Sequence, residues 1–305
     1  MMNNINKLIL GTVQFGLKYG INNSVGQVSK EEVKKILDYA QFVGINTLDT
    51  AAGYGDSEKC IGGYHYNSKE LFHIITKFNK DTTISWEDSL KESIKKLYIE
   101  KVDVVMFHSF EHYYSVKSEL PTIINKGRDL YFDKIGVSVY TNNELEQLLY
   151  DDNVEVVQLP FNLLDNESLR ADILKQLKEK GKIIHTRSTF LQGLFYKNIS
   201  SLGNKFNDLI PSLMLISELV RENNININAL AMQYVLSKDY IDGVLIGVDS
   251  SSQLKDNIVS LQSNISKEVL AKIDKIKINN YKVIQTQLSD HLPILIDFDI
   301  VHVHS

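Results

Sequence analysis

The stretch that decides the fold runs Leu48-Asp49-Thr50-Ala51-Ala52-Gly53-Tyr54-Gly55-Asp56-Ser57-Glu58. Residues 46–50 are expected to form a short strand, so Asp49 stands near its C-terminal end. Gly53 and Gly55 flank Tyr54 and allow the backbone to turn tightly around it. A carboxylate and a tyrosine at the end of a buried strand predict the mouth of an active site.

Two later strands end in a similar way. Lys77 closes the apolar run 73–77, and His108 directly follows the run 102–107. Polar residues thus stand at three successive strand ends. Because the chemistry of α/β barrels lies at the carboxyl ends of the strands, we expect these side chains to meet in one site.

Apolar runs and amphipathic stretches alternate through the chain. Eight short apolar runs are expected to be strands, at residues 7–10, 46–50, 73–77, 102–107, 134–138, 154–158, 182–186 and 243–247. Helices are expected at residues 29–43, 86–98, 143–149, 168–179, 210–221 and 228–236. This pattern predicts a single-domain α/β fold, a (β/α)8 TIM barrel. The alternative, a doubly wound dinucleotide-binding fold, lacks a G-x-G-x-x-G sequence after the first strand.

The first of these helices has the clearest start and stop. Ser29 and Glu32 have the spacing of a capping box, in which the serine side chain binds a free amide of the first turn and the glutamate reaches back. Gly44 is expected to end this helix before the next strand.

The composition indicates one large globular domain with an acidic balance. The chain has 305 residues, 43% of them hydrophobic, and a formal net charge of -5. No run of Lys and Arg suggests nucleic-acid binding, and no apolar run reaches the ~18 residues that span a bilayer. Cys60 is the single cysteine and the first residues are polar, so we expect a cytoplasmic protein without an intrachain disulfide or signal peptide. No histidine spacing suggests a metal site.

The four polar residues at the strand ends are suited to protonating a carbonyl oxygen. A tyrosine hydroxyl has a pKa of about 10 in water. The ammonium of Lys77 would favour the phenolate and lower the pKa of Tyr54, while Asp49 would hold that ammonium by a charge-assisted hydrogen bond. His108 would donate to a substrate oxygen and fix its direction. Together these groups would deliver a proton to oxygen while a hydride reaches the carbon.

The same residues carry a resemblance to a known family. Residues 48–58, Lys77 at the end of Ile-Ile-Thr-Lys, and His108 in Met-Phe-His-Ser are similar to the catalytic tetrad motifs of the aldo-keto reductase superfamily. The likeness extends over about residues 7–275. It implies a (β/α)8 barrel and NAD(P)H-dependent reduction of an aldehyde, ketone or sugar-derived carbonyl. By this resemblance Tyr54 is the general acid, its lysine and aspartate partners tune it, and the histidine orients the carbonyl.

The resemblance also implies a nicotinamide dinucleotide across the barrel mouth, NADP(H) first and NAD(H) second. Ser138 and Gln158 match the pair that binds the nicotinamide carboxamide, although Val139 stands where the family usually has asparagine. Arg187 stands where an aromatic residue commonly stacks on the nicotinamide, and an arginine plane can stack too. The full set of candidate cofactor-binding positions is Gly11, Thr12, Ser138, Gln158, Arg187, Ser188, Gln192, Gly193, Gly247, Ser250, Gln253 and Asn257.

The segment after the last strand bears on the choice of dinucleotide. Residues 247–257 resemble the segment that holds the adenosine phosphate, but Ser250 stands where many members carry a cation, which leaves Lys255 and the serines. Asp249 would repel the 2′-phosphate of NADP(H), since unit charges ~4 Å apart at an effective dielectric of ~20 interact by roughly 4 kcal/mol before screening. Amides at the helix start, with Ser250 and Ser251, would still hold that phosphate. NADP(H) therefore stays the first choice, with NADH accepted better than by relatives that carry cations here.

The barrel accounts for residues 1–279, and residues 280–305 form a tail of unknown role. The tail contains the strand-like run 294–303, preceded by Ser289-Asp290-His291-Leu292-Pro293. This pentapeptide is similar to the closing motif of the endonuclease/exonuclease/phosphatase superfamily, but too little chain is left for that fold. A packing strand or a disordered tail is the better expectation.

Three functions remain open from the sequence. The leading hypothesis is a carbonyl reductase that uses NAD(P)H on a small-molecule substrate. The second is a cofactor-binding regulatory or scaffolding protein on the same barrel. A third, a phosphate-binding barrel isomerase, rests only on the serine-rich turn at residues 250–252. His73, His112 and His185 are expected to be structural, and His65 to lie on the surface.

Overall fold

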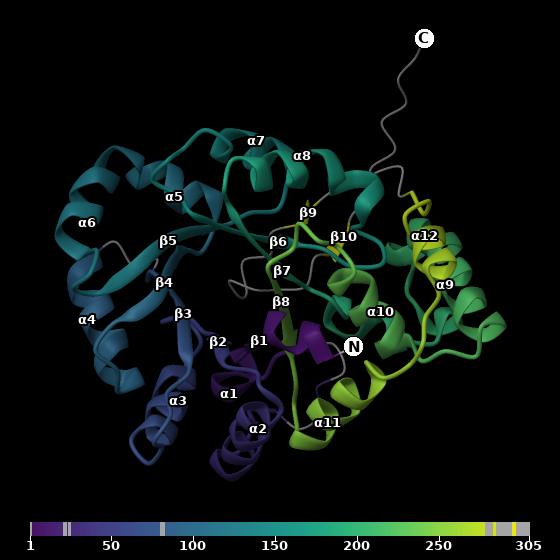
Figure 1. Cartoon of the computed structure of the whole chain (residues 1–305), viewed down its shortest axis with the longest axis horizontal. Helices are drawn as coiled ribbons and strands as arrows, with labels where there is room; N and C mark the ends of the chain where they lie inside the picture. The colour runs from purple at the N-terminus through teal and green to yellow at the C-terminus, as the bar shows by residue number, and fades with distance from the viewer. Residues whose placement is uncertain are drawn as a thin grey trace.

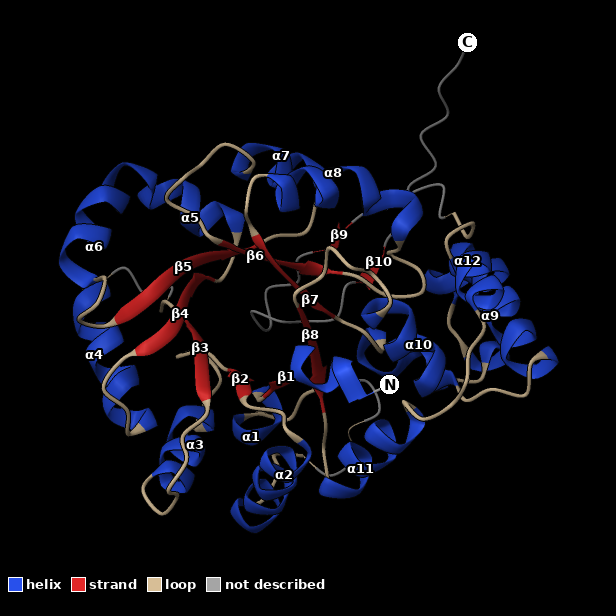
Figure 2. Cartoon of the chain, viewed as in Figure 1, coloured by secondary structure: helices blue, strands red, loops and turns tan. Residues whose placement is uncertain are grey.

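The computed structural model describes residues 2–20, 23, 26–79, 83–277, 283–284 and 295–296. Eight parallel strands close into a barrel in the order β1 to β8. In Figure 2 these strands lie in the middle of the molecule and helices surround them. The strands are β1 (Leu8–Gly11), β2 (Thr47–Asp49), β3 (His73–Lys77), β4 (Val102–Phe107), β5 (Phe132–Ser138), β6 (Val156–Pro160), β7 (Ile183–Arg187) and β8 (Gly243–Gly247). The predicted (β/α)8 barrel is confirmed, and each strand lies within two residues of its predicted ends.

The centre of the barrel is filled by apolar side chains. Ile9 on β1 pairs in register with Leu245 on β8, and both belong to a cluster that also contains Ile75, Val104, Met106 and Val156. Inward-pointing branched residues pack such a barrel as a solid core. A second, larger cluster lies between the strands and the outer helices. The packed interior leaves the ends of the strands as the place for a cavity.

The barrel closes between the strands that are farthest apart in the chain. Gly11 of β1 pairs with Asp49 of β2 on one side and with Gly247 of β8 on the other. These three residues therefore lie at one level of the barrel, at the C-terminal ends of their strands. The loops that follow β1, β2 and β8 start from the same rim.

Helices cover the outside of the barrel (Figure 1). The longer ones are α2 (Lys30–Val43), α3 (Ser57–His65), α4 (Trp86–Leu97), α6 (Leu120–Gly127), α8 (Glu167–Glu179), α9 (Ile210–Glu222), α10 (Ile227–Leu236) and α11 (Ser251–Ser260). The shorter ones are α1 (Val13–Gly16), α5 (Phe110–Val116), α7 (Asn142–Leu148) and α12 (Lys267–Ile273), with 3-10 turns η1 (Met2–Lys7), η2 (Lys117–Glu119), η3 (Leu191–Tyr196), η4 (Ile199–Ser201) and η5 (Asn204–Leu209). The six predicted helices are present. Helices α3 and α6 were not predicted, because glycines in α3 and Pro121 in α6 weaken the helical signal.

The start of α2 differs from the prediction in one contact. Ser29 Oγ accepts the amide of Glu32 at 3.2 Å, and Gly44 ends the helix with a φ of 90°. Glu32 does not complete the capping box. Its Oε1 instead accepts hydrogen bonds from the amide and the hydroxyl of Ser251, each at 2.7 Å. The first amides of α11 have no partner within their own helix and attract a carboxylate, and α2 lies beside α11.

Helix α1 and the turn after β2 are in backbone contact at Tyr54. Gly55 has a φ of 56°, in the left-handed region that favours glycine. A Cβ at Gly16 would lie 1.7 Å from the carbonyl oxygen of Tyr54, and a Cβ at Gly55 would lie 2.5 Å from the carbonyl oxygen of Gly16. Glycine is therefore required on both sides of the contact. Gly16, which the sequence did not single out, positions Tyr54 together with Gly55.

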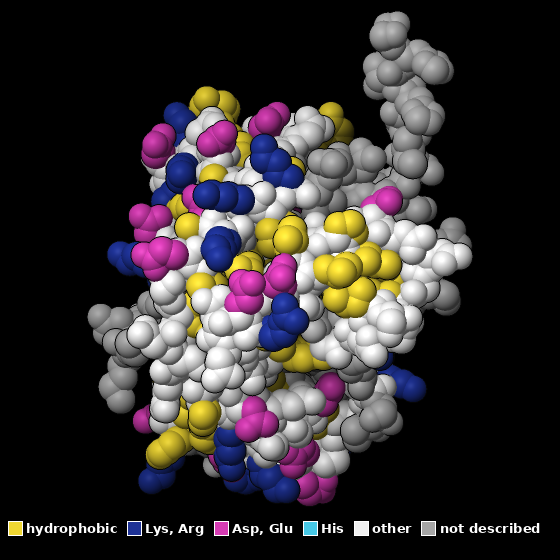
Figure 3. Space-filling model, turned by 90° about the vertical axis from the view of Figure 1, so that its right-hand side faces the viewer, with side chains coloured by type: hydrophobic (Ala, Val, Ile, Leu, Met, Phe, Trp, Pro, Cys, Tyr) yellow, Lys and Arg dark blue, Asp and Glu magenta, His cyan; other side chains and the backbone are white. Residues whose placement is uncertain are grey.

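The surface carries charges of both signs. On the face that Figure 3 shows, Lys and Arg side chains are interspersed with Asp and Glu. No helix in the described part of the chain is long and apolar enough to cross a membrane. His65 is buried, so its predicted place on the surface is wrong: its Nδ1 donates to the carbonyl of Leu97 at 2.9 Å and its Nε2 accepts the amide of Phe72 at 3.2 Å.

Beyond residue 277 the description is limited to two short strands. Strand β9 (Val283–Ile284) pairs antiparallel with β10 (Leu295–Ile296). The pentapeptide at residues 289–293 and most of the strand-like run at 294–303 lie outside the described residues. The role of the tail stays an open question.

Candidate active site

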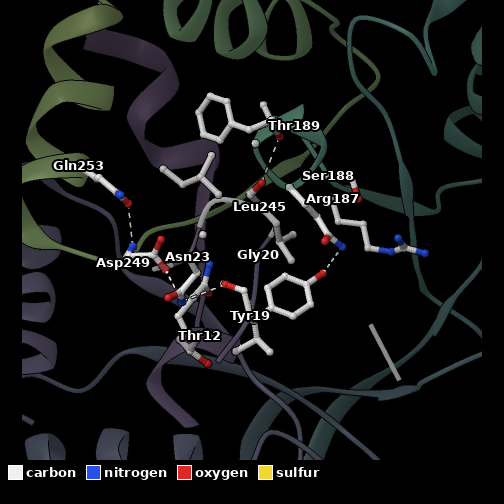
Figure 4. A pocket seen from close by; sticks show the side chains of 18 of the residues that line it. Thr12, Tyr19, Gly20, Asn23, Arg187, Ser188, Thr189, Leu245, Asp249 and Gln253 are labelled. Atoms are coloured by element: carbon white, nitrogen blue, oxygen red, sulfur yellow. Dashed lines mark hydrogen bonds between the residues drawn. The ribbon is translucent and has the colours of Figure 1, made fainter. Parts of the chain in front are cut away.

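A cavity of about 450 Å³ opens at the C-terminal ends of the barrel strands. Figure 4 shows Asp249 and Gln253 on one side of it and Arg187 on the other. We call the part of the cavity around Asp249 and Gln253, which follow β8, the β8 end. Strands and loops from the beginning, middle and end of the chain all contribute to the lining.

The predicted catalytic residues lie together, in a region that we call the catalytic end. Asp49 and Tyr54 line the cavity, and Lys77 and His108 are buried, with 1% and 4% of their surfaces exposed. The Lys77 ammonium lies 5.1 Å from the centre of the Tyr54 ring. The His108 ring meets the Tyr54 ring edge to face, with centres 6.0 Å apart. Three strand ends thus place three polar side chains around the phenol that the turn after β2 supplies.

Asp49 and Lys77 form a buried ion pair beneath the phenol. Lys77 Nζ donates to Asp49 Oδ1 at 2.5 Å and to the carbonyl of Thr50 at 2.9 Å. The second carboxylate oxygen of Asp49 accepts the side-chain amide of Gln158 at 2.9 Å. Burial lowers the pKa of Lys77, and the adjacent Asp49 carboxylate opposes that shift. Every polar atom of this pair therefore has a partner, which fixes its geometry.

The pKa of Tyr54 is shifted in the direction opposite to the one predicted from the sequence. We expected Lys77 to lower it, but burial holds the pKa of Tyr54 well above its usual value, with the Asp49 carboxylate adding to the rise. The charge of Lys77 is balanced by Asp49 at 2.5 Å, and Arg187 is the cation that opposes the rise. The phenol consequently keeps its proton at neutral pH, as a proton donor requires.

Most of the predicted cofactor-binding positions gather in the cavity. Ten of the twelve line it, namely Gly11, Thr12, Gln158, Arg187, Ser188, Gln192, Gly193, Gly247, Gln253 and Asn257. Ser138 and Ser250 do not. Ser250 Oγ caps α11 by accepting the amide of Gln253 at 3.2 Å.

Ser138 is buried next to a residue that does line the cavity. It pairs in register with Gln158 across β5 and β6. Its Oγ is buried and has no hydrogen-bond partner among the described residues. Buried polar atoms are almost always hydrogen-bonded. A hydroxyl without a partner beside an amide side chain fits a ligand that carries an amide of its own.

Several residues of the loop after β7 have a positive φ angle, a backbone conformation that residues other than glycine seldom adopt. Ser188, Leu191 and Gln192 have φ angles of 62°, 45° and 54°, and Gly193 has 93°. A non-glycine residue in such a conformation costs about 1–3 kcal/mol, and such residues cluster at binding sites. Gln192 Nε2 donates to the hydroxyl of Tyr19 at 2.6 Å, which ties this loop to the loop after β1.

Asn23 makes a second tie between distant loops (Figure 4). Its Nδ2 donates to Asp249 Oδ1 at 3.2 Å, and the amide of Asp249 donates to Gln253 Oε1 at 2.7 Å. The sequence did not identify Tyr19 or Asn23 as cavity residues. They belong to a loop without a motif, and their partners are 173 and 226 positions away.

The β8 end is acidic. Asp249 and Asp256 line it, and burial raises the pKa of Asp249. The hydrogen bonds from Ser251 lower the pKa of Glu32 to about 2, so this carboxylate is charged at neutral pH. The expectation that Ser250 and Ser251 are available to a phosphate is therefore not met. Ser250 Oγ caps its own helix, and both donors of Ser251 are bonded to Glu32.

Polar residues at the strand ends of a (β/α)8 barrel define the class of barrel enzymes whose active site lies at the C-terminal face. Among the residues that the structure describes, no group of three or more His, Cys, Asp or Glu side chains is arranged to hold a metal ion. The sequence model of the aldo/keto reductase family matches residues 7–278. The chain therefore belongs to the aldo/keto reductase family of oxidoreductases.

Curated relatives are reductases and dehydrogenases. The chain is 22% identical to norsolorinic acid reductase B of Dothistroma septosporum over 88% of this chain and 78% of the relative. It is 24% identical to L-galactose dehydrogenase of Arabidopsis thaliana, over 88% of this chain and 91% of that relative. It is 21% identical to an NADH-specific methylglyoxal reductase of Escherichia coli, over 74% of this chain and 82% of that relative.

Solved structures of similar fold are aldo-keto reductases. One from Bacillus halodurans, in a holo form, has a TM-score of 0.63 and 19% identity, and the match covers 88% of this chain and 91% of that one. One described as a putative aldo-keto reductase from Pseudomonas aeruginosa has a TM-score of 0.60 and 17% identity, and the match covers 83% of this chain and 88% of that one. These likenesses agree with the barrel described above.

Proposed function

We propose that the protein is a cytoplasmic reductase that transfers a hydride from a nicotinamide dinucleotide to an aldehyde or ketone, with Tyr54 as the general acid. The observation that carries this proposal is the contact of Tyr54 with the buried Lys77–Asp49 pair at the catalytic end. His108 meets the same ring from another direction. Membership of the aldo/keto reductase family supports the proposal.

Each residue of the catalytic end has one task in this proposal. Tyr54 keeps its proton at neutral pH and donates it to the carbonyl oxygen as negative charge develops there. Lys77 stabilises the charge left on the phenol oxygen, and Asp49 holds Lys77 in place. His108 orients the carbonyl. The dinucleotide, when bound, supplies the hydride that reaches the carbonyl carbon.

The residues of the cavity fit such a dinucleotide. The Ser138 hydroxyl, without a partner in the described part of the chain, and the Gln158 amide would bind the nicotinamide carboxamide. The loop at residues 188–193 would hold the pyrophosphate with its backbone amides. Gln253 and Asn257 line the β8 end and would hold the adenosine.

We further propose that NAD(H) binds in preference to NADP(H), which reverses the order expected from the sequence. Glu32 engages the donors at the start of α11, and Asp249 and Asp256 line the same end of the cavity. A 2′-phosphate would thus meet carboxylates where a phosphate site needs donors. Lys255, the cation expected to help, lies over the ring of Tyr39 at 5.4 Å. Among the relatives of this chain, the Escherichia coli methylglyoxal reductase is named NADH-specific.

The experiment that tests the reductase function follows NADH fluorescence with purified protein and then NADH oxidation as aldehydes and ketones are added. We expect Tyr54→Phe to lower kcat/KM by about 10²–10⁴-fold and to leave the Kd of NADH within about twofold, because only the transferable proton is lost. Tyr66→Phe is the matched control, since Tyr66 is 67% exposed on the outside of the barrel. This variant should behave as the parent protein does.

Three other outcomes would each point elsewhere. Turnover by Tyr54→Phe at the parent rate would refute Tyr54 as the acid. NADH binding without turnover of any carbonyl would support a regulatory or scaffolding protein. A failure to bind either dinucleotide would favour the isomerase, whose only support was the serine-rich turn that Glu32 now engages.

A further inference from the structure

Arg187 is the one Lys or Arg among the described residues that line the cavity. It ends β7, and Figure 4 shows its side chain extending on the side opposite Asp249. Its Nη2 donates to the carbonyl of Val139 at 3.3 Å. Its Nε is buried and has no hydrogen-bond partner in the described part of the chain. A guanidinium has five N–H donors, so most of its hydrogen-bonding capacity is left for a ligand.

Some buried cations among the described residues have carboxylate partners, whereas another, Lys182, donates to the backbone carbonyls of Asp151 and Val154. Lys77 pairs with Asp49 at 2.5 Å, and Arg170 binds both oxygens of Asp165 at 2.6 and 2.8 Å. Arg187 forms no ion pair with any residue that the structure describes. Arg187 is half-buried, and a half-buried cation without an ion-pair partner attracts an anion more strongly than a fully solvated one does. The arginine is therefore suited to an anion that arrives with a ligand.

The orientation of the guanidinium is set by Tyr140. The Cζ of Arg187 lies over the Tyr140 ring, 4.2 Å from its centre, in a cation–π contact. Tyr140 itself is held at both ends of its backbone. Its carbonyl accepts Arg170 Nη2 at 2.7 Å, and its amide donates to Glu144 Oε2 at 2.7 Å. The Tyr140 ring and the Val139 carbonyl thus hold the guanidinium in place.

Arg187 belongs to the catalytic end. Burial raises the pKa of both Tyr19 and Tyr54, and the guanidinium of Arg187 opposes the rise at each. All three side chains line the same cavity. A molecule that fills this cavity can therefore present one group to the Tyr54 hydroxyl and another to the guanidinium.

We propose that Arg187 binds a carboxylate of the substrate, so that the carbonyl compounds reduced by this protein carry a carboxylate group. The inference rests on the reductase function proposed above and names the substrate class of the same site. The free edge of a guanidinium matches the two oxygens of a carboxylate, and charge-assisted pairs of this kind are stronger than neutral hydrogen bonds. A neutral substrate would leave the arginine without its partner.

The test compares 4-carboxybenzaldehyde with its methyl ester, which share the aldehyde and the ring and differ in charge. In the parent protein kcat/KM should be at least about tenfold higher for the acid. Arg187→Gln should lower kcat/KM for the acid about 10- to 100-fold more than it lowers kcat/KM for the ester, the difference expected for a charge-assisted pair. Arg187→Lys should recover part of the loss, because it restores the charge and not the planar edge. Arg221→Gln, an exposed arginine on α9, controls for the change in net charge.

A second measurement does not depend on turnover. Benzoate and the neutral benzamide are titrated into the protein with NADH bound, and NADH fluorescence reports binding. Benzoate should bind at least about tenfold more tightly than benzamide, and Arg187→Gln should abolish that difference. If no carbonyl is reduced but benzoate binds through Arg187, the proposed reductase function fails and the carboxylate site stands.

Other results would overturn the inference and leave the reductase function intact. Equal kcat/KM for the acid and the ester in the parent protein is one of them, and it requires no variant. Equal losses for both substrates in Arg187→Gln would be another. A matching loss of NADH affinity in that variant would assign the arginine to the phosphates or ring of the dinucleotide.

Discussion

The two ends of the cavity are assembled from different parts of the chain. At the catalytic end the ion pair joins two neighbouring strands, since Lys77 ends β3 and Asp49 ends β2, 28 positions apart. At the β8 end the contacts join the beginning of the chain to the loop and helix that follow the last barrel strand. Glu32 and Ser251 are 219 positions apart.

The two ends also differ in how charge is balanced. Lys77 and Asp49 are almost completely buried and neutralise each other. The Glu32 side chain is 25% exposed, so its charge is partly screened by water and salt. Removing one member of a buried pair leaves an uncompensated charge, whereas a substitution at a solvent-exposed site costs little stability. Substitutions at the catalytic end should therefore alter the stability of the fold, and those at the β8 end should alter what binds.

The largest effect is expected from breaking the buried pair. Lys77→Met should lower the free energy of unfolding by about 3–5 kcal/mol, because Asp49 is left as a buried charge without a partner. It should also remove most of the carbonyl reductase activity. Urea denaturation at pH 7 followed by circular dichroism measures the first effect.

The control adds a second substitution. Lys77→Met combined with Asp49→Asn removes both charges, and we expect the double variant to be more stable than Lys77→Met alone while still lacking activity. A single variant as stable as the parent protein would show that the catalytic end is not held by this pair, and the contrast between the two ends would lose its basis.

An intermediate effect on the stability of the fold is expected when the pH is lowered, because His185 takes up a proton. The backbone of His185 pairs with Gln158 and Gly243 in the barrel. Burial lowers the pKa of His185 to about 4. In the unfolded chain a histidine has a pKa of about 6.5, so between these values protons bind preferentially to the unfolded state. Stability should be fully present above about pH 6.5 and should fall as the pH falls toward 4, by about 2–3 kcal/mol from this group.

Unfolding measured at pH 7 and at pH 4.5 tests this expectation. His185→Gln cannot take up the proton, so it should lose less stability than the parent protein between the two pH values. Equal losses for the two proteins would mean that the neutral imidazole near Asp49 does not limit stability in acid.

The smallest effect is expected at the β8 end and concerns affinity alone. Glu32→Ala frees the amide and hydroxyl of Ser251 and removes a negative charge, so the Kd of NADPH should fall by about tenfold, equivalent to about 1.4 kcal/mol, while the Kd of NADH changes little. The free energy of unfolding should change by less than about 1 kcal/mol. Titrations of NADH and NADPH followed by fluorescence give both constants.

Glu31→Ala is the matched control. Glu31 precedes Glu32 in the first turn of α2 and carries the same charge, but Ser251 bonds to Glu32. If Glu31→Ala improves NADPH binding as much as Glu32→Ala does, the effect is one of net charge. A strong preference of the parent protein for NADPH would remove the case for NAD(H) altogether.

The catalytic end was largely predictable from the sequence, because its residues follow buried strands that apolar runs mark. Asp49, Lys77 and His108 each stand at such an end, and Gly55 marks the turn beside Tyr54. The direction of the Tyr54 pKa was not predictable, since it depends on burial by elements from the whole barrel.

The β8 end was predictable only in outline. The sequence placed Gln253 and Asn257 in the cavity correctly, since they follow the last strand. It assigned Glu32 to a local cap, because the capping-box pattern compares residues three positions apart and contains nothing about a helix 219 positions later. Asn23 and Tyr140 were missed for the same reason, since only the closed barrel brings their loops to the cavity.

The pairing of β1 with β8 has a consequence for the synthesis of the protein. At about 5–20 residues per second, the ribosome needs on the order of 10 to 50 s between the first and the last barrel strand. During that time β1 has one edge without its neighbour, and unpaired edges invite contacts with other chains. A chain that stops before Gly243 lacks β8, so β1 and β7 each keep one open edge. The last strand therefore closes both edges at once and completes the rim from which the β8 end of the cavity is built.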